Sequence, residues 1–297
     1  MATQSESTIG FFLLPWEFSW PWVLFCLALA ALYIRGMIVW RRGGRHTGIF
    51  RPLAFFVGLG AIYAVTQTRY DYLAQFLFFA HRGQHLVLHH LGPFLVALSA
   101  PTAVMASGLP AAVTARWNSP AGVWAGMAAG LRGTYRVLQH PLLAPLLFVG
   151  LIYFWLIPAV HFDAMLSARL YQLMNWSMLI DGLLFWWLML DPRSRDQGAL
   201  GYGHRITILA IIVPPQIALG AYITFSRDVL FDIYSVCGRA WPLEPLTDQQ
   251  LGGIVTWIPA AMMSLLGVLV VLRYLLRGAP MTRTIPMHRV GGENAAT

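Results

Sequence analysis

Long apolar segments follow one another along most of this chain, and each has the length that a helix needs to cross a lipid bilayer. The sequence is 58% hydrophobic and 11% charged, whereas an ordinary soluble domain has about 25% charged residues. The sequence therefore predicts an all-α membrane protein, a polytopic bundle of about seven transmembrane helices. The seven segments are Trp20–Trp40, Pro52–Gln67, Ala74–Leu98, Pro141–Val160, Leu170–Leu190, Arg205–Phe225 and Leu251–Leu276.

The arginines are distributed unevenly between the two sets of segments that connect these helices. The chain has 20 basic residues, and none of them is lysine. Fifteen arginines lie in one set of connections, four lie in the opposite set, and Arg82 lies inside a predicted span. Because cytoplasmic loops carry the excess of positive charge, we expect the N-terminus outside and the C-terminus in the cytoplasm. The net charge of +8 then reflects contact with the inner leaflet of the cell's inner (plasma) membrane, and it does not indicate a nucleic-acid partner.

The predicted helices form a single transmembrane domain over residues 1–278, and a polar, basic tail follows over residues 279–297. Two connections are substantial. The cytoplasmic loop 101–140 includes Ala121–Leu138, which fits an amphipathic helix on the membrane surface. The outer loop 226–250 contains one tryptophan, two prolines and four carboxylates, and we expect it to form a structured cap.

Histidine recurs at every fourth position within the third predicted span. His81, His85 and His89 therefore form one stripe on a helix. Imidazoles are costly in lipid, so the stripe is expected to face the protein interior. His161, at the outer end of the fourth predicted helix, lies at the same level as His81 and His85. Imidazole is a ligand that suits copper, with carboxylate as an occasional partner.

The fifth predicted helix adds further candidates on one face. Met174, Met178 and Asp181 follow one another at spacings of four and three residues, which places them on the same side of a helix. An ionisable side chain this deep in a bilayer is usually paired or functional. Asp181 is therefore either a metal ligand or a hydrogen-bonding partner, whereas the methionines fit a core. We expect Arg82 either to pair with Asp181 or to extend outward to the membrane surface.

The residues alone leave two interpretations open. A single intramembrane histidine is more often a hydrogen-bonded structural residue than a ligand. Three histidines on one stripe fit a functional cluster and a structural role equally well. His90 lies off the stripe and is expected to be structural. No catalytic nucleophile, phosphate-binding loop or acid–base pair is recognisable in the sequence, so we expect a protein that is not an enzyme. The candidates for a metal site are His81 and His85 first, then His89, His161 and Asp181.

Four blocks of the sequence, in chain order, carry a family resemblance. They are AHRGQHLVL from Ala80, HPLLAPLLFVGLIYFW from His140, GLLFWWLML from Gly182 and PLTDQQLGGIVTWIPAAM from Pro245. They resemble blocks of the CtaG family, which is associated with the assembly of caa-type cytochrome c oxidases. The first is similar to that family's AHMxQHxxL, and the last is similar to its DQQLGGxxMWxPGG signature. The resemblance covers nearly the whole chain.

The chain also departs from the family pattern. The family often has a histidine just before the proline of the fourth helix, where this chain has Leu156 and Ile157. It also has a His-Glu-His-like group in the fifth helix, where this chain reads YQLMNW from Tyr171. His81 and His85 therefore correspond to the family's paired histidines, whereas a complete family metal site does not carry over.

The resemblance implies an assembly factor that acts at the outer side of the membrane, where copper is delivered to the oxidase. Its expected partners are cytochrome c oxidase subunits and the lipid bilayer, and copper is the candidate metal. Two alternatives stay open. One is a structural assembly scaffold that binds no metal. The other is a haem b electron-transfer protein, in which His81 or His85 and a histidine on another helix ligate the haem.

Overall fold

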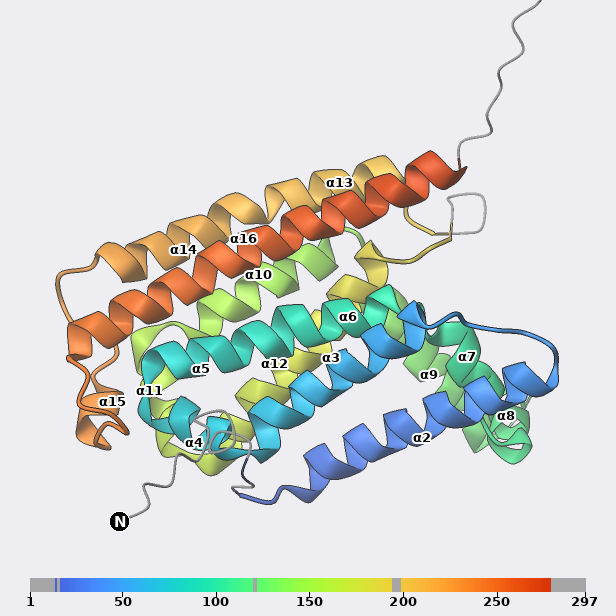
Figure 1. Cartoon of the computed structure of the whole chain (residues 1–297), viewed down its shortest axis with the longest axis horizontal. Coiled ribbons are helices and arrows are strands. Elements are labelled where there is room, and N and C mark those ends of the chain that lie inside the picture. The colour runs from blue at the N-terminus through green and yellow to red at the C-terminus, as the bar shows by residue number, and fades with distance from the viewer. Residues whose placement is uncertain (1–13, 15–16, 120–121, 194–198, 279–297) are drawn as a thin grey trace, which may run out of the picture.

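The fold is that of a helical bundle, shown in Figure 1 by a computed structural model. The structure describes residues 14, 17–119, 122–193 and 199–278, so the predicted tail 279–297 lies outside the described residues. All elements assigned within these ranges are helical. In chain order they are α2 (Trp20–Arg42), α3 (Phe50–Gln67), α4 (Arg69–Phe76), α5 (Phe78–His85), the π-helix η1 (Leu86–Leu91), α6 (Gly92–Leu98), α7 (Thr102–Gly108), α8 (Ala111–Trp117), α9 (Val123–Leu138), α10 (Leu143–Trp155), α11 (Pro158–Leu166), α12 (Ala168–Met189), α13 (Tyr202–Ile211), α14 (Val213–Phe225), α15 (Ile233–Val236) and α16 (Pro245–Gly278).

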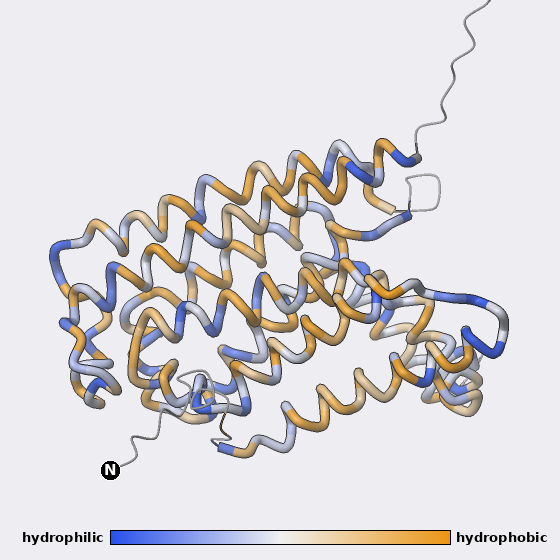
Figure 2. Tube along the Cα trace, viewed as in Figure 1, coloured by the Kyte–Doolittle hydropathy of each residue, from blue (hydrophilic) through white to orange (hydrophobic). Residues whose placement is uncertain are grey.

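The bundle has two distinct ends. The long helices run between them, with α16 lying along α14 and α13, and α2 forming one flank (Figure 1). The short helices α4, α11 and α15 gather at one end, and α7, α8 and α9 gather at the other. Apolar residues dominate the long helices, while hydrophilic residues concentrate at the two ends (Figure 2). This distribution is the one expected for a bundle whose middle lies in hydrocarbon.

Several helices of the described residues are long and apolar enough to cross a membrane. Four qualify singly: α2, α3, the run of α13 with α14, and α16 as far as Arg277. The number rises to six if each of two bent pairs is one span, namely Phe78–Leu98 with α7, and α9 with α10. α12 has 22 residues, but Asn175 and Asp181 lower its hydropathy. The protein is thus an all-helical, multi-pass membrane protein, whereas seven crossings and the orientation of the termini stay predictions.

The surface of the bundle is apolar where a water-soluble protein would be polar. Leu24 and Leu27 on α2 are 57% and 60% exposed, and Leu265 on α16 is 60% exposed. Contiguous apolar surface of this kind is a liability in water. In a bilayer the same side chains face acyl chains, which are as apolar as leucine.

The third predicted span is not one uniform helix, because α5 passes through the π-helix η1 before α6 begins. Pro93 lies in the first turn of α6 and has no N–H group, so it leaves the carbonyl of His89, four residues earlier, without a helical donor. The indole nitrogen of Trp186 donates to that oxygen instead, at 3.2 Å. The wider π turn changes the helical register beyond His85. The single stripe predicted for His81, His85 and His89 is therefore interrupted.

Prolines also divide other predicted helices. The predicted span Pro141–Val160 ends at Trp155, because Pro158 begins a new helix and the residue before a proline disfavours the α conformation. α13 and α14 are separated at Ile212, just before Pro214.

The predicted outer loop 226–250 is shorter than expected, since α16 already begins at Pro245 and α15 lies within the loop. The predicted cytoplasmic loop 101–140 is largely helical and contains α7, α8 and α9.

Candidate functional site

Three buried histidines meet near the end of the bundle that carries α4, α11 and α15. His81 and His85 lie on α5, and His161 lies on α11. Each is at most 1% exposed. The ring centroids of His81 and His85 are 4.3 Å apart, and those of His81 and His161 are 5.1 Å apart. The structure therefore brings together three of the five residues that the sequence marks as metal candidates, and we call them the histidine cluster.

Two helix breaks orient His81 and His161 in the same way. α4 ends just before α5, and α10 ends just before α11, so each break leaves backbone carbonyl groups without a helical donor. Nδ1 of His81 lies 3.2 Å from the carbonyl oxygen of Ala74, and Nδ1 of His161 lies 3.1 Å from that of Trp155. A carbonyl oxygen only accepts, so Nδ1 carries the proton in both rings and Nε2 has a lone pair. This is a tautomer in which Nε2 can bind a metal ion.

The two Nε2 atoms have different surroundings. Nε2 of His81 is buried and has no hydrogen-bond partner. Nε2 of His161 accepts the hydroxyl proton of Tyr234 at 2.9 Å. Tyr234 lies on α15, outside the predicted spans, and burial raises its pKa well above the ordinary value. The hydroxyl therefore stays protonated at neutral pH and donates a hydrogen bond to His161.

His85 uses both of its ring nitrogens in hydrogen bonds. Nη1 of Arg82 lies 3.1 Å from Nδ1 of His85. Because a guanidinium only donates, Nδ1 must accept and the proton must be on Nε2. Nε2 then donates to Oδ1 of Asn175 at 3.0 Å. In this conformation Nε2 carries a lone pair in His81 and His161, whereas in His85 it carries the proton.

Arg82 is a buried cation beside this cluster. It is 4% exposed, and its Nε donates to the hydroxyl of Thr256 at 3.0 Å. Within the described ranges, no carboxylate lies within 4.0 Å of its guanidinium. The predicted ion pair between Arg82 and Asp181 is therefore wrong, and so is the outward extension of Arg82. A buried, uncompensated positive charge makes the neighbouring space unfavourable for a highly charged cation.

His89 and Asp181 form a second cluster deeper in the bundle. Nε2 of His89 lies 3.0 Å from Oδ2 of Asp181, and its ring stacks on Phe148 with centroids 4.0 Å apart. Asp181 is 9% exposed, so it faces the bundle interior as predicted. Nδ1 of His89 and Nε2 of His90 are buried without partners. A cavity of about 10 Å³ lies beside these two residues and Arg82, which is enough space for roughly one water molecule.

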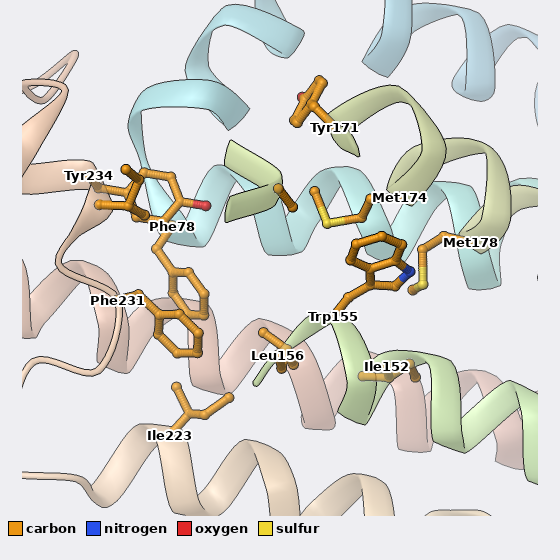
Figure 3. Packing of buried hydrophobic residues seen from close by; sticks show 12 residues of the cluster. Phe78, Ile152, Trp155, Leu156, Tyr171, Met174, Met178, Ile223, Phe231 and Tyr234 are labelled. Carbon is orange, nitrogen blue, oxygen red and sulfur yellow. The ribbon is translucent and has the colours of Figure 1, made fainter. Parts of the chain in front are cut away.

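Aromatic and sulfur-containing side chains enclose the histidine cluster. Phe78 stacks on Phe231 with ring centroids 4.3 Å apart, and Tyr234 lies beside them (Figure 3). Met174 and Met178 pack near Trp155 (Figure 3) and are at most 1% exposed. The methionines are thus part of the core, as the sequence suggests. This dense packing keeps water away from the ring nitrogens.

The five metal candidates do not gather at a single point. Within the described part of the chain, no group of three or more histidines, cysteines or carboxylates is arranged to hold a metal ion. His89 and Asp181 bind each other instead of joining the histidine cluster. A metal ion at the cluster would therefore be held by two imidazoles rather than by the larger set. Copper binding itself stays a prediction.

Comparison with known proteins identifies the family. The sequence model of the cytochrome c oxidase caa3 assembly factors, Caa3_CtaG, matches residues 31–278. The chain belongs to this family. Two uncharacterized proteins, from Mycobacterium bovis and Mycobacterium tuberculosis, are each 28% identical over 239 residues, which is 78% of this chain and 35% of each relative. The chain thus spans about a third of the length of these curated relatives. No solved structure matches it.

The block that resembles the CtaG signature, which begins at Pro245, joins elements at the end of the bundle that carries the histidine cluster. Asp248 accepts hydrogen bonds from the backbone N–H groups of Phe78 and Phe79 at 3.0 and 2.9 Å, and it forms an ion pair with Arg239. It thereby caps the first turn of α5, the helix that carries His81. Gln249 donates to the carbonyl of Asp228 and fixes the segment before α15. These residues are positioning residues that the spacing of histidines does not reveal.

The glutamine of the AHRGQH block has a similar positioning role. Nε2 of Gln84 donates to Oδ1 of Asp71 and to the carbonyl of Val65, both at 2.7 Å. The hydroxyl of Tyr171 lies 2.8 Å from the same carboxylate oxygen. This buried network joins α3, α4, α5 and α12 next to His81. The spacing of residues along the sequence does not predict this network, because the partners of Asp71, Gln84 and Tyr171 come from helices far apart in the sequence.

Proposed function

We propose that this protein is an assembly factor for a caa3-type cytochrome c oxidase in the plasma membrane, and that it holds a copper ion between His81 and His161 during assembly. Membership of the Caa3_CtaG family supports the first part. The observation that carries the second part is the buried, unpartnered Nε2 of His81, whose ring lies 5.1 Å from that of His161. Oxidase subunits are then the partners, and the protein has no catalytic role of its own.

An unpartnered acceptor in a dry interior calls for an explanation. A buried polar atom without a hydrogen bond costs roughly 1–3 kcal/mol. The cost is offset if the atom binds a ligand during the working cycle. Backbone carbonyls hold the opposite nitrogens of both rings, and such outer-shell contacts orient histidines that ligate metals.

The charge of the surroundings favours a monovalent ion. The cluster itself contains no carboxylate, the nearby carboxylate of Asp71 accepts hydrogen bonds from Gln84 and Tyr171, and Arg82 contributes a buried positive charge beside the cluster. Repulsion from that charge is twice as large for a divalent ion as for Cu⁺ at the same distance. Imidazole suits copper, so we propose that the ion is Cu⁺.

Tyr234 controls access to the second ligand. Its hydroxyl occupies Nε2 of His161, so the metal can bind both histidines after Tyr234 moves aside. Tyr234 belongs to the outer segment that Gln249 fixes through Asp228 and Leu230. An oxidase subunit that displaces this segment would open the site for copper transfer.

A scaffold that binds no metal is the second candidate function. The hydrogen bonds of His85 and His161 and the absence of a three-ligand group among the described residues favour it. A haem ligated by His85 is disfavoured, because a cofactor pocket has a volume of about 300 Å³ or more. The cavity that His85 lines together with His89 and His90 measures about 10 Å³.

Cu⁺ titration of the purified protein under reducing conditions, against a chromophoric chelator, tests the metal site. We expect one Cu⁺ per chain, and we expect His81→Ala and His161→Ala to weaken binding by more than the roughly 10- to 100-fold that the loss of an outer-shell contact costs. His90→Ala is the matched control, since His90 lies outside the histidine cluster. Equal affinity of all three variants, or an absence of binding, would refute copper handling. A Soret absorption band would indicate haem instead.

Deletion of the gene, followed by assay of oxidase subunits and copper in the membranes, tests the assembly role separately. We expect oxidase activity to fall and to return with the wild-type gene. If the His81→Ala gene, expressed in the deletion strain, restores full copper loading of the oxidase, the scaffold function is supported and the copper site is refuted. An intact oxidase after deletion would refute the assembly role itself.

A further inference from the structure

We infer that the protein binds one anionic phospholipid in a large cavity at the end of the bundle opposite to the histidine cluster. The cavity has a volume of about 810 Å³ and lies between α2, α3, α7, α9 and the end of α12. This inference is independent of the proposed function, because no residue of the histidine cluster lines the cavity.

A sharp bend in the chain creates the space. α7 turns away from Phe78–Leu98 by 76°. The turn contains Ala100, whose φ of 48° is rare for a residue with a side chain, and Pro101 follows it. Such backbone strain persists where the surrounding structure fixes it, often at binding sites. Small side chains on the bent segment, including Ala103 and Ala106, leave the volume open.

The interior of the cavity is mostly apolar. Trp40 and Trp187 form part of its wall, together with leucines of α12. The indole nitrogen of Trp40 donates to the hydroxyl of Ser107 at 2.9 Å, so the ring is held in place. Apolar cavities do not retain water. In a membrane protein, an acyl chain is the material at hand to fill such a space.

The rim of the cavity carries positive charge. Arg51 and Arg193 both line it, and one carboxylate, Asp191, pairs with Arg193 at 2.6 Å. The two arginines and one carboxylate leave a net charge of +1, which matches one phosphodiester group. Arg205 donates to the carbonyl oxygens of Leu200 and Arg193 and thereby holds the rim segment against α13.

The surroundings indicate a lipid headgroup rather than a soluble anion. The amphipathic helix α9 contributes Tyr135 to the rim, and such helices lie at the boundary between headgroups and acyl chains. This end also carries the predicted cytoplasmic arginines, which attract the anionic lipids of the inner leaflet. A phosphate with acyl chains satisfies both the charged rim and the apolar interior.

Native mass spectrometry of the full chain in mild detergent, with phosphatidylglycerol and phosphatidylcholine added in equal amounts, tests the inference. We expect one retained phosphatidylglycerol per chain. Arg51→Gln should lower the preference for phosphatidylglycerol about fivefold, and Ala106→Phe should remove the retained lipid by filling the cavity. Arg41→Gln is the matched control, because Arg41 lies at the same end but does not line the cavity.

A second measurement guards against misfolded variants. Phosphatidylglycerol with brominated acyl chains should quench tryptophan fluorescence of the wild-type protein, and Trp40→Phe with Trp187→Phe should reduce that quenching. Equal retention of the two lipids by the wild type, or retention unchanged by Ala106→Phe, would overturn the inference. Quenching that is the same with and without Trp40 and Trp187 would also overturn it.

Discussion

At the scale of single residues, the hydrogen bonds of each imidazole determine what it can do. His81 and His161 donate from Nδ1 to backbone carbonyls, which leaves Nε2 with a lone pair. His85 is held between a donor on one side and an acceptor on the other. Neighbouring histidines on the same helix therefore have different chemistry. The difference follows from their partners rather than from their spacing.

A change at Asp181 tests the second cluster at the same scale. Asp181→Ala should lower the free energy of unfolding by about 1–3 kcal/mol, because the N–H of His89 then has no acceptor in a buried position. Asp181→Asn should have a much smaller effect, since its amide oxygen can still accept. Thermal unfolding of the purified variants in detergent measures both. Equal stability of the alanine and asparagine variants would contradict the inferred hydrogen bond.

The sequence predicts the right residue types at this scale but not their partners. A spacing of four places His81 and His85 together, and this is what the structure shows. The acceptors at Ala74 and Trp155 arise from helix breaks, and the hydroxyl of Tyr234 comes from a distant loop. Periodicity carries no information on such contacts, because they depend on where the chain leaves the helical path.

At the scale of elements, interruptions of the helices build the site. The prolines at 93 and 158 could be read from the sequence as points of disruption. The π turn next to Pro93, which separates His89 from His85, could not, because it depends on the packing of Trp186 against the freed carbonyl. The existence of the helices is thus predictable from hydropathy. Their internal breaks, which set the ligand geometry, depend on contacts between helices.

Close packing of α12 against η1 gives a prediction at the element scale. A Cβ atom at Gly182 would lie 2.4 Å from the carbonyl oxygen of His89, so Gly182→Ala must push the two helices apart. We expect a loss of about 1–3 kcal/mol in the free energy of unfolding. Gly150→Ala is the control, because nothing lies within 4 Å of a Cβ there, and removing a helical glycine stabilises by roughly 0.5–1 kcal/mol. The same shift in melting temperature for both variants would show that α12 and η1 are not in close contact.

At the scale of the whole molecule, the two ends of the bundle carry different candidate sites. One end has the histidine cluster with its capping segment, and the other has the arginine-rimmed cavity. The uneven distribution of arginine along the sequence predicts such a polarity across the membrane. The orientation of the bundle in the membrane can be tested by labelling, because the two cysteines of the chain lie in different environments.

Cys237 lies exposed in the segment after α15, whereas Cys26 is buried within α2. If the end with the histidine cluster faces outward, a membrane-impermeant maleimide added to intact cells should label Cys237. Cys237→Ser should abolish the labelling, and Cys26→Ser should leave it unchanged, because a thiol packed between helices does not meet the reagent. Labelling is read as a mass shift of the purified protein. If Cys237 reacts after lysis but not in intact cells, the orientation is the inverse of the predicted one. The histidine cluster would then lie on the cytoplasmic side of the membrane, and the proposed delivery of copper at the outer surface could not take place.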